Sequence, residues 1–334
     1  MAILVTGGAG YIGSHTAKAL HRAGREVVVF DNLAHGHEWA VRWGPLVRGE
    51  LADRDALDRV FQTCSIDAVL HFAALIQVGE SMRLPGLYFR NNTAGTLNLL
   101  EAMAAHGVQR IVFSSTAAVY GMPERMPVSE DAPSAPINVY GESKWMVERL
   151  LHWFGAIHEL RWTALRYFNA CGADPEGETG EDHAPESHLI PRVMGAALGR
   201  LPAIEVFGTD FPTPDGTCIR DYIHVADLAS AHLRALGHLE RGGASGAFNL
   251  GSGQGISVRE IIAGVERVAG RPVPVRYGPR RDGDPPVLVA DPARANQMLG
   301  WRTEHSGLET ILRSAWHWHA ELGKGLCAFG PVRE

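Results

Sequence analysis

The sequence predicts an α/β protein built on a doubly wound parallel sheet of the Rossmann type, with a smaller mixed α/β lobe beside it. Two observations predict this fold class. In the first half of the chain, short β-rich runs alternate with amphipathic segments, and a glycine-rich turn directly follows the first run. Such alternation is typical of βαβ units, in which parallel strands are buried on both faces. The expected strands cover residues 3–6, 26–30, 67–72, 110–115 and 162–167.

This pattern loosens beyond about residue 169. The stretches that follow are rich in glycine, proline and charged side chains, which predicts loops over residues 171–187, 208–216 and 278–286. We therefore expect a first domain over residues 1–169 and a second lobe formed mainly by residues 170–334. Segments near residues 221–250 are expected to return to the first domain, so that the two parts are interleaved.

Composition limits the possible functions. The chain has 334 residues, 46% of them hydrophobic, and a formal charge of −6 from 31 Lys+Arg and 37 Asp+Glu. This excludes a disordered tail and argues against a nucleic-acid partner, because a polyanion is bound by a basic face. The hydrophobic runs are shorter than the roughly 18–20 residues of a membrane span, so we expect no membrane partner. Cysteines without the close spacing of a zinc site or a disulfide scaffold indicate reduced thiols and a cytoplasmic protein; they are Cys64, Cys171, Cys218 and Cys327.

A glycine-rich turn follows the first expected strand. Gly7, Gly10 and Gly13 lie three residues apart, and a helical pattern then runs to about Ala23. Without β-carbons, such a turn lets backbone N–H groups and the helix N-terminus approach a pyrophosphate. Asp31 follows the second expected strand, 18 residues after Gly13, where a carboxylate can accept from an adenosine ribose hydroxyl. Together these features predict a dinucleotide site rather than a merely structural turn.

The residues around Asp31 also bear on the choice between NAD and NADP. A carboxylate repels the 2′-phosphate of NADP, whereas a neighbouring arginine attracts it. Asn32 and Leu33 follow Asp31, and neither is basic. The sequence therefore favours NAD, unless Arg25 or Arg42 folds next to this site.

A second group of residues bears on catalysis. Tyr140 and Lys144 are four residues apart, so they share one face if the segment is helical, as the run after them indicates. A nearby cation favours the phenolate form and makes the phenol a usable base at neutral pH. Thr116, just after the strand expected over 110–115, would bring a hydroxyl to the edge of the sheet where α/β sites open. The simpler alternatives are surface residues on a helix and a threonine that satisfies a loop.

The motifs around these residues closely resemble those of the extended short-chain dehydrogenase/reductase family, and within it the UDP-glucose 4-epimerases, over essentially the whole chain. They are VTGGAGYIGSH (5–15), HFAA (71–74), FSSTAAVYG (113–121), YGESK (140–144), RYFN (166–169), DGT (215–217) and RDYIHV (220–225). The resemblance implies that NAD oxidises C4 of a UDP-hexose, that the 4-keto sugar turns over in the site, and that the hydride returns to its other face. It also implies a homodimer, with NAD bound by the first domain and the UDP-sugar by the second lobe.

The same resemblance assigns roles to single residues. Tyr140 would take the proton of the C4 hydroxyl, Lys144 would tune Tyr140 and bind the nicotinamide ribose, and Thr116 would share the sugar's O4. Besides Tyr140, Lys144 and the three glycines, the residues around NAD would be Tyr11, Ile12, Asp31, Asn32, Glu50, Leu51, Phe72, Ala73, Ala74, Asn91 and Phe168. Besides Thr116, those around the UDP-sugar would be Asn169, His188, Leu189, Phe207, Arg220, Arg281, Asp284 and Leu288.

Four of these assignments have simpler alternatives. Arg220 and Arg281 lie in loop-like contexts and suit a diphosphate, yet each could be a solvated surface residue. Asp284 could instead pair with a neighbouring arginine. Leu288 stands where resembling epimerases restricted to unmodified hexoses place a tyrosine, which implies room for an N-acetyl group at C2 of the sugar. The alternative is that Leu288 is ordinary strand core.

Two rival functions share the fold. A nucleotide-sugar dehydratase or decarboxylase needs an additional acid or base beside the sugar, and related dehydratases carry Asp-Glu directly after the strand-end threonine. Ala117 and Ala118 stand there and cannot transfer protons. A non-catalytic NAD-sensing scaffold is the other rival, against which the presence of Tyr140, Lys144 and Thr116 together argues.

Two further features concern charge and metals. Ile76 stands where some epimerases carry lysine, so one cation near the cofactor is missing. We expect no metal site. His317 and His319 are two residues apart on a helical pattern and point to different faces, and His183 and His188 flank a Pro/Glu loop without companion ligands.

Overall fold

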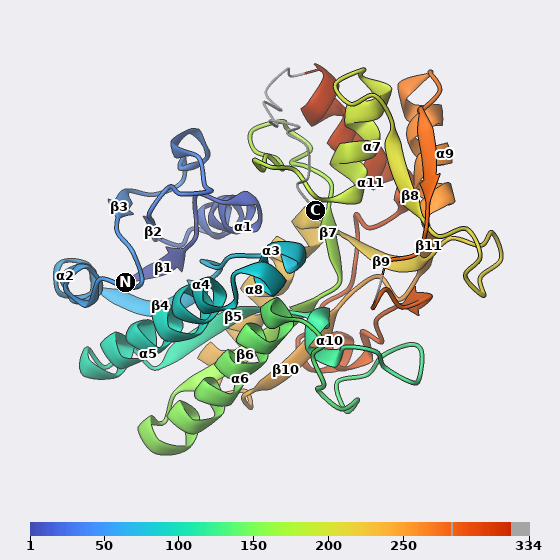
Figure 1. Ribbon diagram of the computed structural model, residues 1–334. Coiled ribbons are helices and arrows are strands. Elements are labelled where there is room, and N and C mark those ends of the chain that lie inside the picture. Colours follow the sequence, from blue (N-terminus) through green and yellow to red (C-terminus); the bar gives the residue numbers. More distant parts are fainter. Residues whose placement is uncertain (282, 322–334) are drawn as a thin grey trace.

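A parallel sheet forms the centre of the computed structural model, which describes residues 1–281 and 283–321 (Figure 1). Within these residues it has seven strands in the order β3-β2-β1-β4-β5-β6-β10. The order reverses at β1, as it does in doubly wound folds, so the predicted fold class is confirmed. The strands are β1 (Ala2–Thr6), β2 (Val27–Asp31), β3 (Leu46–Arg48), β4 (Ile66–His71), β5 (Arg110–Thr116), β6 (Arg161–Tyr167) and β10 (Gly246–Leu250).

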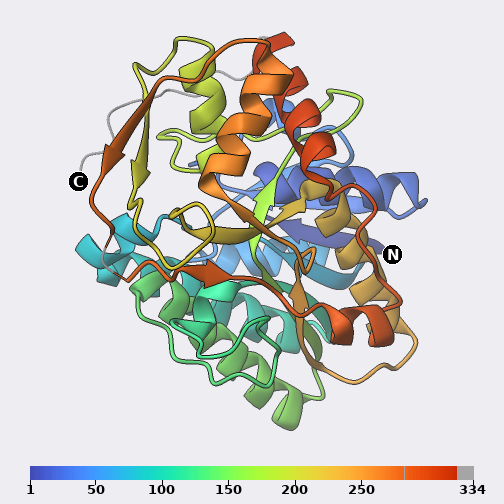
Figure 2. The same ribbon diagram turned by 90° about the vertical axis from the view of Figure 1, so that its right-hand side faces the viewer.

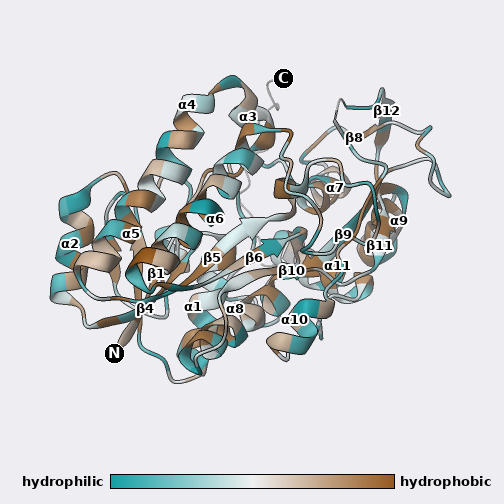
Figure 3. Cartoon of the chain, turned by 90° about the horizontal axis from the view of Figure 1, so that it is seen from below, coloured by the Kyte–Doolittle hydropathy of each residue, from teal (hydrophilic) through white to brown (hydrophobic). Residues whose placement is uncertain are grey.

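Helices cover both faces of this sheet (Figure 3). Ile3 and Val5 of β1 pack into one hydrophobic layer, whereas Leu4 packs into the other. Burial on both faces explains why the strands are continuous apolar runs. The first layer contains α1 (Tyr11–Arg22), α8 (Val225–Glu240) and α10 (Ala293–Met298), and the second contains α2 (Arg54–Thr63), α5 (Gly95–Ala105) and α6 (Val139–His158).

Late segments of the chain return to this body. β10 pairs with β6 at the edge of the sheet, and α8 packs against α1. At the opposite edge, β3 is a strand that the sequence analysis does not predict. Its three residues are partly or fully exposed, and it pairs with β2 at the end of the sheet, so it lacks the continuous apolar pattern of the buried strands.

The smaller lobe is built around β9 (Ile219–His224). Its partners β7 (Asn169–Cys171) and β13 (Val287–Leu288) run parallel to it, and β11 (Gly255–Ser257) runs antiparallel. A separate parallel pair joins β8 to β12. Three helices pack on one another above these strands (Figure 2). The remaining elements of this lobe are β8 (Ile204–Phe207), β12 (Val275–Gly278), α7 (Leu189–Ala197), α9 (Val258–Ala269) and α11 (Leu308–Trp316).

Irregular and short helical segments connect these elements. Residues 172–188 and 208–218 contain no helix or strand, in keeping with the predicted loops. The chain between β4 and α5 forms α3 (Val78–Arg83), α4 (Pro85–Tyr88) and a π-helical segment, η2 (Phe89–Ala94). The other short segments are η1 (Glu38–Ala40), η3 (Ala117–Tyr120) and η4 (His317–Glu321). Among the described residues, no helix combines the length and apolarity that crossing a membrane requires.

A buried ion pair attaches α6 to the sheet. Arg166 of β6 donates from Nε and Nη2 to the carboxylate of Glu148 on α6, at 3.0 and 2.6 Å, and both side chains are at most 5% exposed. Ser115 of β5 donates to the same carboxylate. Arg166 also donates to the hydroxyl of Tyr120, which in turn donates to Asn249 of β10. Removing either charge would leave the other buried and unpaired, a change that typically costs about 3–5 kcal/mol.

We therefore expect Glu148→Ala to lower the free energy of unfolding by about 3–5 kcal/mol, because the Arg166 guanidinium stays buried without its counter-charge. Denaturant titration measures this loss. Arg149→Ala, which changes the exposed neighbour on the same helix, is the control and should alter stability by no more than about 0.5 kcal/mol. Equal losses in the two variants would contradict the assignment.

Candidate active site

The glycine-rich turn between β1 and α1 leaves no room for side chains. A Cβ on Gly7 would lie 2.5 Å from the backbone N of Ala73, and one on Gly13 would lie 2.2 Å from the carbonyl oxygen of Gly7. Gly10 caps α1 without a side-chain acceptor, and the first turn of α1 holds no acidic residue. The N–H groups in the first turn of α1 therefore have no intrahelical acceptor and can receive an anion, so the site fits the pyrophosphate of a dinucleotide.

Asp31 lies at the end of β2 and contacts this turn directly. Its Oδ2 accepts from the backbone N–H of Ala9 at 3.0 Å, and its Oδ1 accepts from that of Leu33 at 2.8 Å. Asp31 thus holds the turn in place, a role that the sequence analysis did not include. Each carboxylate oxygen keeps a further lone pair, which is available to a ribose hydroxyl.

The proposed catalytic side chains meet at the carboxyl edge of the sheet. Thr116 ends β5, Tyr140 lies in the first turn of α6, and the two side chains line the same cleft, where the Thr116 hydroxyl is close enough to lower the pKa of the Tyr140 phenol. This approach requires glycine at position 141, because a Cβ there would lie 2.6 Å from the carbonyl oxygen of Ala118. Asn138 caps α6 by accepting from the N–H of Gly141 at 2.8 Å. Helix start and strand end are therefore held in contact.

Burial dominates the electrostatics of this site. It raises the pKa of Tyr140 above its usual value, and the hydrogen bond with Thr116 lowers that pKa in part. Lys144 is 2% exposed, and its Nζ donates to the carbonyl oxygen of Ser114 at 2.8 Å. Burial lowers the pKa of Lys144 to about 7. Thr116 is thus the residue that lowers the pKa of Tyr140. From the sequence we expected Lys144 to have this effect.

One cleft collects every residue that the sequence analysis assigns to cofactor or substrate. Its volume is about 2220 Å³, against roughly 300–1,000 Å³ for a typical small-molecule pocket. Residues of both the large sheet and the smaller lobe line it. The cleft is therefore large enough for a dinucleotide and a second nucleotide side by side.

Guanidinium groups face this cleft from the smaller lobe. Arg220 and Arg281 were expected, and the guanidinium of Arg281 lies 3.7 Å from the centre of the Phe207 ring. Arg192 of α7 also lines the cleft, although the sequence analysis missed it. Burial, and then repulsion by Arg281, lower the pKa of Arg192, so these two guanidinium groups lie close enough to act on each other. Such a pair fits a diphosphate. Its position just after His188 and Leu189, which were both assigned to the substrate, could have indicated that Arg192 lines the same site.

The arginine partner of Asp284 comes from another strand. Arg220 of β9 donates from Nη2 to Oδ1 of Asp284 at 2.5 Å. The partner of Asp284 is therefore not an arginine adjacent to it in sequence. Leu288 of β13 pairs in register with Arg220, lines the cleft and packs, partly buried, against the hydrophobic cluster that contains Ala117 and Tyr120. The sequence left open whether Leu288 belongs to the strand core or to the pocket wall. In the structure it belongs to both.

A buried asparagine that sequence reasoning missed supports the cleft wall. Asn92, in the π-helical η2, accepts from the N–H of Leu75 at 2.8 Å and donates to its carbonyl oxygen and to the hydroxyl of Ser143 on α6. π-helical turns are frequent at functional sites. Asn92 itself does not line the cleft, so its role is to hold the segment after β4 against α6.

The two histidines of the loop before α7 do have companions. The sequence analysis describes His183 and His188 as lacking them, yet the carboxylates of Glu181 and Glu186 lie against both rings. The loop folds back on itself, which residue spacing alone does not show. Of the four cysteines, Cys64, Cys171 and Cys218 are free thiols, and Cys327 lies outside the described residues.

Comparison with known proteins identifies the family. A model of the NAD dependent epimerase/dehydratase family matches residues 3–251. The chain belongs to this family. It is 51% identical over 325 residues to a UDP-glucose 4-epimerase of Halalkalibacterium halodurans, covering 97% of each chain.

Solved structures of epimerase/dehydratase family members agree with this assignment. The UDP-glucose 4-epimerase of Brucella ovis in complex with NAD is 52% identical, with a TM-score of 0.93, covering 95% of this chain and 98% of that one. The enzyme of Stenotrophomonas maltophila, with bound NAD and formylated UDP-arabinopyranose, is 44% identical, with a TM-score of 0.93, covering 97% and 99%.

Three positions in the cleft wall carry side chains that cannot titrate. Ala117 and Ala118 follow Thr116 into η3 and line the cleft, so neither position offers an acid or base to the sugar. Ile76 also lines the cleft and is 40% exposed, which leaves that wall without a cation at this position. Both observations bear on the reaction that the site supports.

Proposed function

We propose that this enzyme is an NAD-dependent 4-epimerase that interconverts UDP-glucose and UDP-galactose. The observation that carries the proposal is that Thr116, Tyr140 and Lys144 line one cleft with Arg192, Arg220 and Arg281. A proton-transfer pair thus faces a diphosphate-binding region within one cavity. The relatives named UDP-glucose 4-epimerase, about half identical over nearly the full length, support the same reaction.

In this proposal, Tyr140 takes the proton from the C4 hydroxyl and later returns it. Thr116 hydrogen-bonds the phenol oxygen, which favours the deprotonated form that burial opposes. Its hydroxyl is also placed to share O4 of the sugar. General-base catalysis of this kind contributes roughly 10²–10⁴-fold.

The large lobe would hold NAD, which when bound accepts a hydride from C4 and gives it back. The glycine turn and α1 receive the pyrophosphate, Asp31 receives the adenosine ribose, and Lys144 reaches the nicotinamide ribose. The Lys144 amine is buried and already held by the carbonyl of Ser114, so its direction is set before binding. On this proposal residues 1–169, together with α8 and β10, form the NAD-binding domain, and most of residues 170–334 form the UDP-sugar lobe.

The choice of NAD over NADP follows from charge. Asp31 places a carboxylate at the ribose position, which repels a 2′-phosphate. The two arginines that could reverse this preference are engaged by acidic residues of other segments: Arg25 pairs with Glu240, and Arg42 pairs with Glu178 at 3.2 Å. Free thiols and the formal charge of −6 further support a cytoplasmic enzyme whose partner is a nucleotide sugar rather than a nucleic acid.

The rival functions lack support in the cleft. Water elimination needs an additional acid or base beside the oxidised sugar, and the residues that follow Thr116 are Ala117 and Ala118. A passive NAD-sensing scaffold would have no use for a diphosphate region opposite a buried phenol. Adding UDP-galactose to the purified enzyme tests this rival, because appearance of the near-ultraviolet absorbance of reduced NAD shows that the sugar is oxidised.

Replacement of the base is the sharpest test of the mechanism. We expect Tyr140→Phe to keep fold and bound NAD but to lose roughly 10²–10⁴-fold in kcat, since only the proton-transfer oxygen is removed. A coupled epimerisation assay measures kcat, and absorbance of the released cofactor measures NAD. Tyr277→Phe, which removes a phenol that is 60% exposed on β12, is the control and should retain full activity. Normal turnover in NAD-loaded Tyr140→Phe would refute the role.

We further propose that the sugar pocket admits an N-acetyl group at C2. Leu288 borders the cleft and pairs in register with Arg220, so its size would set the space available beside the sugar. The leucine side chain is shorter than that of tyrosine and does not reach as far as the outer edge of a tyrosine ring would. The enzyme would therefore interconvert UDP-N-acetylglucosamine and UDP-N-acetylgalactosamine as well as the unmodified hexoses.

Enlarging residue 288 tests this pocket. Leu288→Tyr should lower kcat/KM for the N-acetylated substrates at least about 100-fold, by steric exclusion, while changing that for UDP-galactose less than about 5-fold. Leu288→Met, which conserves volume, should leave both values near wild type. If wild type fails on the N-acetylated pair, or if the tyrosine variant loses both activities equally, the pocket assignment is wrong.

We also propose that the enzyme is a homodimer associated through α6. Met146, Trp153 and Ile157 are 41, 54 and 67% exposed, and their spacing places them on one face of this helix. A stripe of large apolar side chains on one helix suits a second copy of the same helix, because a two-fold axis brings identical surfaces together.

A charge placed in this stripe should prevent the association. We expect Trp153→Glu to elute as a monomer, since a carboxylate buried at a two-fold interface would face its own copy. Light scattering coupled to size-exclusion chromatography measures the mass. Met298→Glu, at an exposed methionine of α10, is the matched control and should leave a dimer. A monomeric wild type, or a Trp153→Glu dimer, would rule out this interface.

A further inference from the structure

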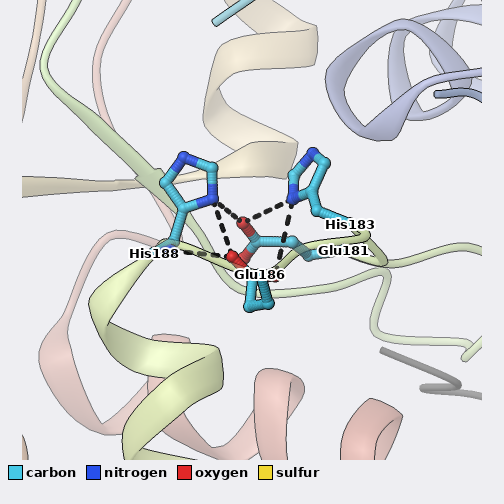
Figure 4. Close-up of side chains that lie close together, drawn as sticks. All are labelled: Glu181, His183, Glu186 and His188. Carbon is cyan, nitrogen blue, oxygen red and sulfur yellow. Dashed lines mark hydrogen bonds and ion pairs between the residues drawn. The ribbon is translucent and has the colours of Figure 1, made fainter. Parts of the chain in front are cut away.

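Four side chains of the loop before α7 converge on one point. They are Glu181, His183, Glu186 and His188, and one ligand atom of each lies within 4.8 Å of the others (Figure 4). Both imidazoles direct Nδ1 toward the carboxylates, and their other ring nitrogens point away (Figure 4). The Nδ1-to-carboxylate distances are 2.8 and 3.1 Å from His188 and 3.4 and 3.5 Å from His183.

Hydrogen bonds satisfy this cluster only in part: Oε1 of Glu186 accepts from the backbone N–H of His188 at 2.7 Å and lies 3.1 Å from Nδ1 of the same residue. The Glu181 and Glu186 side chains are 3% and 0% exposed. Within the described part of the chain, Oε1 of Glu181, Oε2 of Glu186 and Nδ1 of His183 have no hydrogen-bond partner, although they lie near one another. Buried carboxylate oxygens without donors are costly, and two of them side by side need a positive charge between or beside them. The unpartnered atoms therefore point to a cation.

The spacing matches a metal coordination shell. In a tetrahedral site with bonds of about 2.1 Å, ligand atoms lie about 3.4 Å from one another. The observed nitrogen–oxygen distances of 2.8–3.5 Å fall around that value. Imidazole nitrogen and carboxylate oxygen together suit zinc and its first-row neighbours rather than Mg²⁺ or Ca²⁺, which prefer oxygen alone.

We propose that Glu181, His183, Glu186 and His188 bind one divalent transition-metal ion of the Zn²⁺ class. Two carboxylates and two neutral imidazoles neutralise the ion's charge, and four protein ligands make the site closed and structural rather than catalytic. The inference concerns the loop's own residues and does not rest on the epimerase reaction.

Its position gives this ion a task. Nδ1 of His188 faces the cluster, while the residue borders the substrate cleft. Glu186 also presents its backbone carbonyl to Nη1 of Arg192 at 3.2 Å, and the ring of His183 lies edge-on to Tyr11 of the glycine turn, 6.2 Å between centres. The ion would therefore fix the loop that joins the dinucleotide turn to the diphosphate-binding arginines.

A second acidic group in the same loop serves as the comparison. Asp174, Glu176 and Glu178 also lie close together, but Lys18 already contacts all three, at 2.6, 3.1 and 2.7 Å. That group has its counter-charge within the chain. The rival explanation for the proposed site is similar: both histidines would be protonated and would neutralise the two glutamates without a metal.

Metal content and metal binding distinguish these explanations. We expect the untagged enzyme, as purified, to contain close to one zinc or related ion per chain by elemental mass spectrometry. After chelation, calorimetric titration with ZnCl₂ should restore one site and raise the melting temperature. Co²⁺ in place of zinc should give the intense visible bands of a four-coordinate ion. No stoichiometric ion, no binding after chelation, or the weak spectrum of six-coordinate Co²⁺ would overturn the proposal.

Matched variants assign the ligands. Glu186→Gln and His183→Asn should each weaken Zn²⁺ binding at least about 100-fold, since each removes a direct ligand, whereas loss of a mere outer partner costs about 10–100-fold. Glu176→Gln and His152→Asn change the same residue types at exposed positions and should bind as wild type does. Equal affinity in all variants would show surface binding and refute the site. If a ligand variant fails to fold, the wild-type Co²⁺ spectrum decides.

Discussion

The catalytic geometry depends on one steric constraint, the contact between the start of α6 and the chain that leaves β5. Only glycine fits at position 141, because a Cβ would lie 2.6 Å from the carbonyl oxygen of Ala118. That contact brings Tyr140 to Thr116, and one turn later it buries Lys144 against Ser114. The Glu148–Arg166 pair then fixes the rotation of α6 about its axis. Helix and sheet therefore behave as one rigid support, as a site tolerant of little displacement requires.

The sequence predicts the sheet well because its strands are buried on both faces and read as apolar runs. β3 escapes prediction for the opposite reason, since Leu46–Arg48 is short, partly exposed and paired at the edge of the sheet. The element ends that carry Thr116 and Tyr140 are also predicted, because motifs mark them, while the catalytic roles of these two residues stay a prediction. What the sequence does not show is how separate loops meet: Asp284 pairs with Arg220, 64 residues away, and Glu181 reaches His188 only because the loop folds back.

Burial has opposite effects at the two ends of the cleft. At the catalytic end it raises the pKa of Tyr140 and lowers that of Lys144 to about 7, so both groups are shifted toward their neutral forms. At the other end, Arg192 and Arg281 stay cationic and repel each other. An anion with its charge concentrated at one end is thereby oriented, with the diphosphate on the arginines and the neutral sugar toward Tyr140.

This division of charge suits a reaction in which both faces of C4 must meet the same hydride donor. On the proposed function, guanidinium groups would hold the nucleotide, and this binding would be the same for glucose, galactose and the 4-keto sugar between them. Around the sugar, by contrast, stand Ala117, Ala118 and Leu288, which offer contact without directional hydrogen bonds. Because strong binding is confined to the part that does not react, the sugar can turn about its link to the diphosphate without the substrate being released. The loop of residues 181–188 completes this arrangement, since Glu186 supports Arg192 through its carbonyl while its carboxylate faces the histidine pair.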